Sequence, residues 1–178
     1  MIYKEKVLTP ADCYSVKELK VDQIGCINKP NSVLFHGRFC PLSNFYPCNF
    51  TVSGNRFSCV EQYYQFQKTT FCGMWNLSHQ ILLASDPVDM KRLADSADKD
   101  IWPVGLQIAA MKTALSKKFS QNIELANFLK ETGDKRIVEC NKYDKFWGIG
   151  RSIYDKNAKS GPGENMLGRC LEEVRDNM

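Results

Sequence analysis

The sequence lacks any long apolar run. No uncharged hydrophobic stretch approaches the roughly 18 residues that a membrane-spanning helix needs. Near the start, Lys4, Glu5, Lys6 and Asp12 stand where a secretory signal would carry its apolar core. We therefore expect no membrane span and no secretory signal, and we expect the protein to work in the reducing cytoplasm.

The sequence also lacks a strong excess of charge of one sign. Lys and Arg number 24 against 20 Asp and Glu, which gives a formal net charge of +4. Dedicated nucleic-acid-binding proteins are usually more basic, with their cations clustered. The short pairs Lys117-Lys118 and Lys142/Lys145 are typical of solvated faces. This balance permits an anionic partner without requiring one.

Histidine is scarce, and paired cysteine motifs are absent. The chain has two histidines, His36 and His79, and none of its eight cysteines forms a C-x-x-C pair. Zinc sites ordinarily need such ligands at such spacings, so we expect no metal site. In a reducing compartment the cysteines should be free thiols, mostly small buried hydrophobic residues. They are Cys13, Cys26, Cys40, Cys48, Cys59, Cys72, Cys140 and Cys170.

The residues that are present indicate one α+β domain behind an N-terminal extension. The 178 residues are 43% hydrophobic and 25% charged, which is typical of a single globular domain. Residues 1–31 have weak periodicity and are interpreted as an extension, which leaves residues 32–178 as the domain. Long amphipathic stretches with few and short apolar runs predict a mainly helical α+β fold. The sequence does not indicate an oligomeric state.

The predicted elements follow in chain order. Strands are expected at 33–35, at 50–52 and 56–57 as a hairpin, and at 137–138. Helices are expected from Ser58 to about Thr70, from Pro87 behind an Asp86 cap, from Pro103 as the longest, from a Ser120 cap to Gly133, and around Leu167–Val174. Between the last strand and the last helix, residues 143–163 are expected to form a loop rich in aromatic residues and glycine.

The first candidate site lies on the helix expected after Ser58. Glu61 and Lys68 are seven residues apart, which returns both to one helix face, about 10 Å apart along the axis. Tyr64 and Gln65 lie between them on that face. A carboxylate and an amine so placed can serve one pocket. The alternative is structural, because Ser58-x-x-Glu61 matches a capping box and Lys68 would be a solvated charge near the helix end.

Two further clusters lie in expected loops. Asp144-Lys-Phe-Trp147-Gly148 places an acid beside a Trp and a glycine, which suits a loop near a ligand or one that plugs the core. Gly163 and Asn165 precede the last helix, where backbone N–H groups can bind phosphate, but this short glycine motif favours a plain loop.

The last candidates are polar or aromatic residues next to turns. Ser43-Asn44 can cap a turn or contact a ligand. Trp102, just before Pro103, is either a hydrophobic staple for the following helix or a stacking platform for a substrate ring.

In this order, these segments resemble the NADAR superfamily of YbiA-like N-glycosidases. The matching pieces are Pro41-Leu-Ser-Asn-Phe45, Glu61-Gln-Tyr-Tyr-Gln-Phe-Gln-Lys68, Trp102, Lys118-Phe-Ser-Gln-Asn122, Asp144-Lys-Phe-Trp147-Gly148 and Gly163-Glu-Asn-Met-Leu-Gly168. Two positions depart from the family pattern. Gln62 stands where the family usually has His, and Ile149 replaces an acid of the W-G-D-G loop. The first departure argues against a catalytic role for a histidine at this position, and the second removes one acidic side chain from the loop.

The resemblance implies a compact α+β fold and hydrolysis of an N-glycosidic bond on a phosphorylated ribose, with no cofactor. Two substrate classes are implied, ADP-ribose attached to guanine in nucleic acid and ribosylamino-pyrimidine intermediates of riboflavin synthesis. By the resemblance, Glu61 is the acid/base and Lys68 the nucleophile, and we add Asp144 as a third catalytic candidate. The expected substrate-binding residues are Ser43, Asn44, Tyr64, Trp102, Trp147, Gly148, Gly163 and Asn165.

The chemistry suits that division of labour, with one difficulty. A neutral lysine can form a Schiff base with a ring-opened sugar, and a carboxylic acid can protonate the departing amine. With a reference pKa of about 10.4, only about 0.1% of a free lysine is neutral near pH 7.4. Desolvation would have to favour the neutral amine, or Lys68 is a phosphate clamp and Glu61 alone drives an oxocarbenium-type cleavage. The rival hypothesis is a module that binds NAD or ADP-ribose without turnover.

Overall fold

The computed structural model describes residues 25–97 and 101–178. The backbone divides into two units. The first unit is the chain up to Ser43 together with Ile123–Met178, and the second unit is Asn44–Asn122. Expectations about residues 1–24, including the thiol of Cys13, lie outside the described residues. Both units combine helices with short strands, so the α+β class is confirmed.

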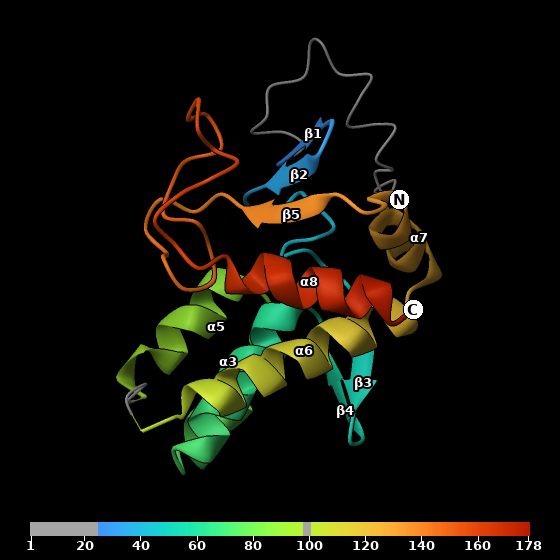
Figure 1. Cartoon of the computed structure of the whole chain (residues 1–178). Coiled ribbons are helices and arrows are strands. Elements are labelled where there is room, and N and C mark those ends of the chain that lie inside the picture. The colour runs from blue at the N-terminus through green and yellow to red at the C-terminus, as the bar shows by residue number, and fades with distance from the viewer. Residues whose placement is uncertain (1–24, 98–100) are drawn as a thin grey trace, which may run out of the picture. The chain divides into compact units, whose positions relative to one another are not determined.

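The first unit is built on a three-stranded sheet (Figure 1). Its order is β1-β2-β5, with β1 antiparallel and β5 parallel to the central strand β2. The strands are β1 (Cys26–Lys29), β2 (Ser32–Phe35) and β5 (Arg136–Glu139). The strands expected at 33–35 and 137–138 are therefore confirmed. β1 lies within the stretch interpreted as an extension, and its low apolar periodicity gave no signal for a strand.

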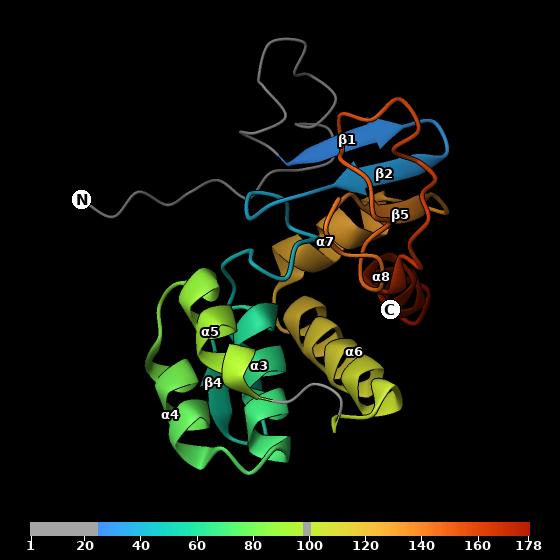
Figure 2. The same ribbon diagram turned by 90° about the vertical axis from the view of Figure 1, so that its left-hand side faces the viewer.

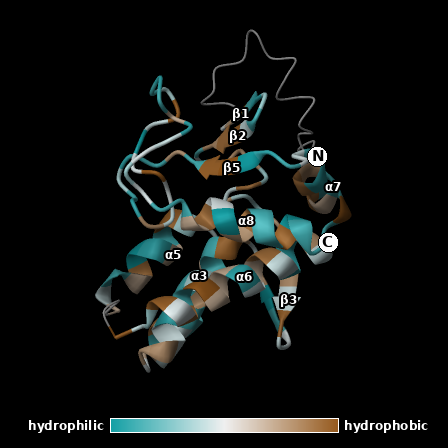
Figure 3. Cartoon of the chain, in the orientation of Figure 1, coloured by the Kyte–Doolittle hydropathy of each residue, from teal (hydrophilic) through white to brown (hydrophobic). Residues whose placement is uncertain are grey.

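Apolar side chains of β2 and β5 form the core of this unit. Leu34 pairs with Val138 across the parallel register, and both are fully buried. They pack with Cys140, Ile149 and Ile153. In Figure 3, β2 carries the hydrophobic colour that this burial requires. Because the loop after β5 supplies Ile149 and Ile153, it is anchored in the core rather than loose.

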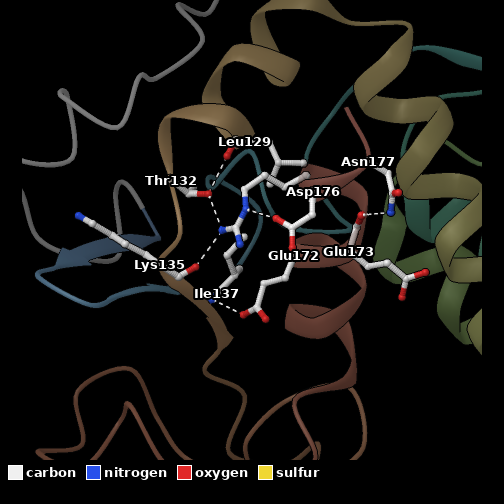
Figure 4. Close-up of polar contacts among 9 residues, drawn as sticks. Leu129, Thr132, Lys135, Ile137, Glu172, Glu173, Asp176 and Asn177 are labelled. Atoms are coloured by element: carbon white, nitrogen blue, oxygen red, sulfur yellow. Dashed lines mark hydrogen bonds and ion pairs between the residues drawn. The ribbon is translucent and has the colours of Figure 1, made fainter.

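Among its described residues, the first unit also contains the helices α7 (Ile123–Glu131) and α8 (Met166–Asp176). α8 contacts both β5 and α7. Its Glu172 carboxylate accepts a hydrogen bond from the Ile137 N–H at 2.7 Å, as Figure 4 shows. Arg175 donates to the Lys135 carbonyl at 2.8 Å and to the Thr132 hydroxyl at 3.1 Å. These bonds tie the last helix to the turn that leads into β5.

The second unit is arranged around α3 (Val60–Phe71), which contacts all the other α-helices of the unit (Figure 2). These are α4 (Trp75–Leu83), α5 (Pro87–Leu93) and α6 (Val104–Ser120), with a short 3-10 helix η1 (Ala94–Ser96) after α5. The hairpin of β3 (Phe50–Val52) and β4 (Asn55–Phe57) contacts α6 and α3. The hairpin, the Asp86 cap of α5 and the length of α6 were predicted correctly.

Three details of the prediction were wrong. Ser120 is the last residue of α6 rather than the cap of α7. α4 was not anticipated, since its sequence has no side-chain N-cap signal. Lys118 was expected on a solvated face, but its side chain is fully buried beside Phe119. Its neighbour Lys117 is exposed as expected.

Among the residues that the structure describes, no helix is both long and apolar enough to cross a membrane. The cysteines described are free thiols, and all except Cys72 are buried, which confirms their expected role as small core residues.

Candidate active site

The start of α3 is capped one residue later than the sequence pattern predicted. Cys59 is the N-cap, and its sulfur accepts from the Gln62 N–H at 3.4 Å. The Gln62 side-chain oxygen reaches back to the Ser58 N–H at 2.7 Å. The predicted capping box of Ser58 and Glu61 is therefore wrong, and capping does not explain why a glutamate stands at position 61.

Gln62 also holds the end of α4. Its side-chain N–H group donates to the carbonyls of Ile81 at 2.9 Å, Leu82 at 3.2 Å and Ala84 at 3.3 Å. These carbonyls lie at the C-terminus of α4, where helical partners run out. The side chain is 3% exposed, so it is a structural link between two helices. The residue that stands in place of the family histidine thus has a packing role.

Glu61 does not cap the helix, and its carboxylate is buried in a defined position. It is 6% exposed, and its Oε1 accepts from the Gln65 Nε2 at 2.7 Å. Its backbone N–H donates to the Asn44 carbonyl at 3.0 Å. Buried carboxylates are rare unless they have partners or a function. The short bond from Gln65 fixes the Glu61 side chain on its helix face.

Lys68 lies two turns further along the same helix. Its side chain is half-buried, and its Nζ donates to the Ala94 carbonyl at 2.8 Å, at the start of η1. Between the two charged residues, the Tyr64 hydroxyl donates to Gln107 at 3.3 Å. Helix geometry therefore places an acid, a phenol and an amine along one side of α3, as the spacing predicted.

Trp102 packs against this helix instead of facing outward. Its ring lies 4.9 Å from the Tyr64 ring, tilted by 48°. The residue is 3% exposed, and its carbonyl accepts from Gln107 at 2.7 Å. Of the two interpretations left open by the sequence, this burial favours the hydrophobic staple over the stacking platform.

A buried lysine and two thiols lie close to the start of α3. The pKa of the Cys59 thiol is raised to about 12, chiefly by burial and also by the Glu61 charge, while the hydrogen bond from the Gln62 N–H and the Lys118 charge oppose the rise. Burial also raises the pKa of Cys48, again against Lys118. The Lys118 ammonium lies 5.6 Å from the Tyr46 ring centre. The thiols near Glu61 are therefore neutral, which disfavours them as nucleophiles.

In the first unit, the Asp144 carboxylate organises its own loop. Its Oδ1 accepts from the N–H groups of Phe146 at 2.9 Å and Trp147 at 2.7 Å. The half-buried Trp147 makes an edge contact with Phe146, with ring centres 4.8 Å apart. This Asx-type turn gives Asp144 a structural role and leaves its catalytic assignment a prediction.

The segment before α8 does not have the free N–H groups that a phosphate would need. Gly163 donates to the Ile149 carbonyl at 3.0 Å, and Asn165 donates to the Gly148 carbonyl at 3.2 Å. The next two N–H groups, of Met166 and Leu167, are also taken by loop carbonyls. The loop after β5 therefore caps α8, and the phosphate-binding interpretation of this segment loses its donors.

Gly163 and Asn165 have structural reasons of their own. A Cβ on Gly163 would overlap the Gly148 carbonyl and lie 2.7 Å from the Ile149 carbonyl carbon. The Asn165 side chain donates to the Ile137 carbonyl at 2.8 Å and accepts from the Glu139 N–H at 2.9 Å, so it extends the edge of β5. Its left-handed backbone, with φ of 54°, suits asparagine.

The structure thus divides the candidate residues between the two units. Within the second unit it joins Asn44 to Glu61 by a hydrogen bond and Tyr64 to Trp102 by a ring contact. Within the first unit it joins Asp144 to Trp147, and Gly148 to both Gly163 and Asn165. The remaining candidate, Ser43, is 8% exposed, and its N–H closes a turn on the Cys40 carbonyl at 2.9 Å.

Sequence reasoning did not select Gln65 as the partner of Glu61 or Lys118 as a buried charge. Gln65 follows Glu61 by four positions, the spacing of helix neighbours, and that signal would have found it. The sequence around Lys118 does not indicate that it is buried, because residues from other segments enclose it. In the described ranges 25–97 and 101–178, no three His, Cys, Asp or Glu side chains gather as metal ligands would.

The relatives of this chain include proteins named N-glycosidases. It is 31% identical over 167 residues to Protein irg-1 of Caenorhabditis elegans, covering 82% of this chain and 79% of that one. It is 34% identical over 170 residues to a riboflavin biosynthesis protein of Vibrio vulnificus, covering 93% of this chain but 41% of that one. N-glycosidase YbiA of Shigella flexneri is 30% identical over 140 residues, with 77% of this chain and 80% of that one covered.

The fold has a solved counterpart. The NMR structure of the Escherichia coli protein YbiA is similar with a TM-score of 0.66 and 25% identity, covering 89% of this chain and 90% of that one. Residues 34–178 match the NADAR domain, which is most of the chain. The resemblance inferred from the ordered motifs is therefore confirmed, and the chain belongs to the NADAR family, whose YbiA relatives are hydrolases of N-glycosyl bonds.

Proposed function

We propose that this protein is an N-glycosidase that hydrolyses the bond between a phosphorylated ribose and the amine of a base. The observation that carries the proposal is the burial of Glu61, which is 6% exposed and has no capping role, on the helix that also carries Lys68. Relatives named N-glycosidases support the reaction class.

In the proposed mechanism, the ribosylamine first opens its ring to an imine at C1. The neutral amine of Lys68 adds to C1, and the amine of the base leaves with a proton from the Glu61 carboxylic acid. The Glu61 carboxylate then takes a proton from water, whose oxygen adds to the lysine imine. Collapse of that adduct releases the sugar as an aldehyde and regenerates Lys68. No redox step occurs.

Two groups position the catalytic side chains for these reaction steps. The Gln65 N–H holds the Oε1 oxygen of Glu61 at 2.7 Å and so orients the carboxylate. The Ala94 carbonyl holds the Lys68 amine at 2.8 Å and must release it before attack. If Lys68 instead stays charged, it serves as a phosphate clamp and Glu61 acts alone on an oxocarbenium-like sugar.

Two substrates fit this proposal. One is ADP-ribose attached to guanine, in nucleic acid or in a fragment of it. The other is a ribosylamino-pyrimidine phosphate, for which the name of the Vibrio vulnificus relative is the specific support. The half-buried Trp147 is the remaining candidate for stacking on the base.

Product analysis with each substrate class tests the proposal. The wild-type protein should release free base and a reducing sugar phosphate from one class, as measured by chromatography and mass spectrometry. Borohydride added during turnover should attach the sugar to the Lys68 peptide. Lys68→Arg should bind ligand without turnover, while Lys117→Arg, an exposed control on α6, should act as wild type.

Each negative result has a distinct meaning. Absence of an adduct together with an active Lys68→Arg variant would replace the Schiff base by the clamp. Binding of ADP-ribose without base release from either class would favour the module that binds without turnover.

A further inference from the structure

Gln65 is a buried side chain whose amide N–H group is hydrogen-bonded but whose amide oxygen is not. It lies on α3 between Glu61 and Lys68 and is 6% exposed. Its Nε2 donates to the Glu61 Oε1 at 2.7 Å. Its Oε1 is also buried, yet it has no hydrogen-bond partner within residues 25–97 and 101–178. Buried acceptors are nearly always paired, so this atom calls for a partner.

Glu61 dictates which end of Gln65 is unpaired. The Glu61 Oε1 is the acceptor in this pair, so the neighbouring amide turns its N–H group toward it. The amide carbonyl of Gln65 then points away from Oε1. The orientation is therefore set by this hydrogen bond, and rotating the amide would place two acceptors against each other.

Asn44, whose backbone is hydrogen-bonded to that of Glu61, has a second unpaired amide oxygen. Its backbone carbonyl accepts from the Glu61 N–H at 3.0 Å, and its Nδ2 donates to the Met111 sulfur at 3.5 Å. Its Oδ1 is buried and, in the described part of the chain, has no partner either. Two buried amide oxygens, on residues that are each hydrogen-bonded to Glu61, thus lack donors in the part of the chain that the structure describes. Such a pair selects a ligand group that donates, such as a hydroxyl, and disfavours a bare phosphate oxygen.

We propose that Gln65 recognises the 2-hydroxyl of the substrate's ribose through its Oε1 while its N–H group positions the Glu61 carboxylate. This inference rests on the proposed function, in which Glu61 acts at C1. The 2-hydroxyl is the donor on the adjoining carbon, so it is the sugar group that comes nearest to a side chain bonded to Glu61. Asn44 accepts from a second donor of the same ligand. Gln65 is thereby a positioning residue that also determines specificity for ribose over 2-deoxyribose.

Calorimetry with two sugar phosphates tests the inference on the full chain. The wild-type protein should bind ribose 5-phosphate about 5- to 150-fold more tightly than 2-deoxyribose 5-phosphate, because the deoxy sugar leaves a buried acceptor unpaired. Gln65→Met keeps the length of the side chain but has no amide oxygen, so it should bind both sugars equally. Gln67→Met, at a half-buried position on the same helix, should retain the wild-type preference.

A second variant separates recognition from packing. Gln65→Asn keeps both the amide oxygen and the N–H group on a side chain one methylene shorter, so it should retain more of the preference for ribose 5-phosphate than Gln65→Met does. The inference would be overturned if Gln65→Met still preferred ribose 5-phosphate, or if its affinity for both sugar phosphates fell by the same factor. So would a wild-type protein with no preference. Gln65→Ala takes the place of Gln65→Met if the latter does not unfold cooperatively.

The outcome is distinguishable from failure of the proposed function. A protein that shows the ribose preference and its loss in Gln65→Met, but releases no base from either substrate class, supports ribose recognition and contradicts the hydrolase. Base release without any ribose preference contradicts the Gln65 assignment alone.

Discussion

Glu61 combines deep burial with a hydrogen-bonded position in a helix that another residue caps. Glu61→Gln preserves the volume, and its amide oxygen can still accept from Gln65. We therefore expect the melting temperature to change little while the rate of base release falls by about 100- to 10,000-fold, the usual contribution of a general acid or base. Thermal unfolding and a chromatographic rate assay measure the two effects. Wild-type turnover in this variant would remove Glu61 from the mechanism.

Gln62, the next residue, should show the opposite behaviour. Gln62→Met removes the partner of the Ser58 N–H and of the carbonyls at the end of α4. Leaving these groups unpaired should lower the free energy of unfolding by about 2–4 kcal/mol. Urea unfolding measures it, with Gln67→Met as a control expected to stay within about 0.5 kcal/mol. Equal stability of the two variants would contradict the structural role of Gln62.

At the scale of elements, α8 approaches β5 through a glycine. A Cβ on Gly168 would overlap the Ile137 carbonyl oxygen and the Asn165 side-chain amide. Gly168→Ala should therefore push the helix from the strand, disturb the bond between Asn165 and Ile137, and lower the unfolding free energy by about 1–3 kcal/mol. Denaturant unfolding is the measurement.

Gly105 supplies the matched control for that substitution. It lies in the first turn of α6, and a Cβ there would meet nothing within 4 Å. Gly105→Ala should raise stability by up to about 1 kcal/mol, because alanine is the better helix former. If Gly168→Ala is as stable as Gly105→Ala, the close approach of α8 to β5 is not a constraint.

At the scale of the whole molecule, both units bury a thiol whose ionisation opposes folding. Burial raises the pKa of Cys59 in the second unit and of Cys140 in the first unit to about 12, from the ordinary 9.0. Above pH 9 the unfolded chain loses these protons while the folded chain keeps them, so the stability falls as the pH rises. The loss should approach about 1.4 kcal/mol per pH unit for each thiol, up to about pH 12.

Urea unfolding between pH 8 and about pH 11 checks this dependence. The comparison is between the wild type and a variant with both Cys59→Ala and Cys140→Ala, because other alkaline titrations are common to the two. The variant is less stable at pH 8 but should show a flatter decline. Parallel declines would mean that the two thiols ionise equally easily in the folded and unfolded chain.

Local patterns in the sequence determined much of this protein. Turn residues and alternation predicted the hairpin of β3 and β4, and proline with its preceding aspartate predicted α5. The seven-residue interval between Glu61 and Lys68 placed both on one side of α3. These features depend on interactions within about one or two helical turns, which a single segment contains in full.

Contacts between distant segments decided the rest. The sequence pattern assigned the α3 cap to Ser58 and Glu61, but Gln62 turned toward α4 and shifted the cap to Cys59. The N–H groups before α8 matched a phosphate site until the loop after β5 supplied their acceptors. Lys118 matched a solvated charge until packing enclosed it. A hydrogen-bonding group or a charge takes the partner that tertiary packing brings to it, and no local pattern records which partner that is.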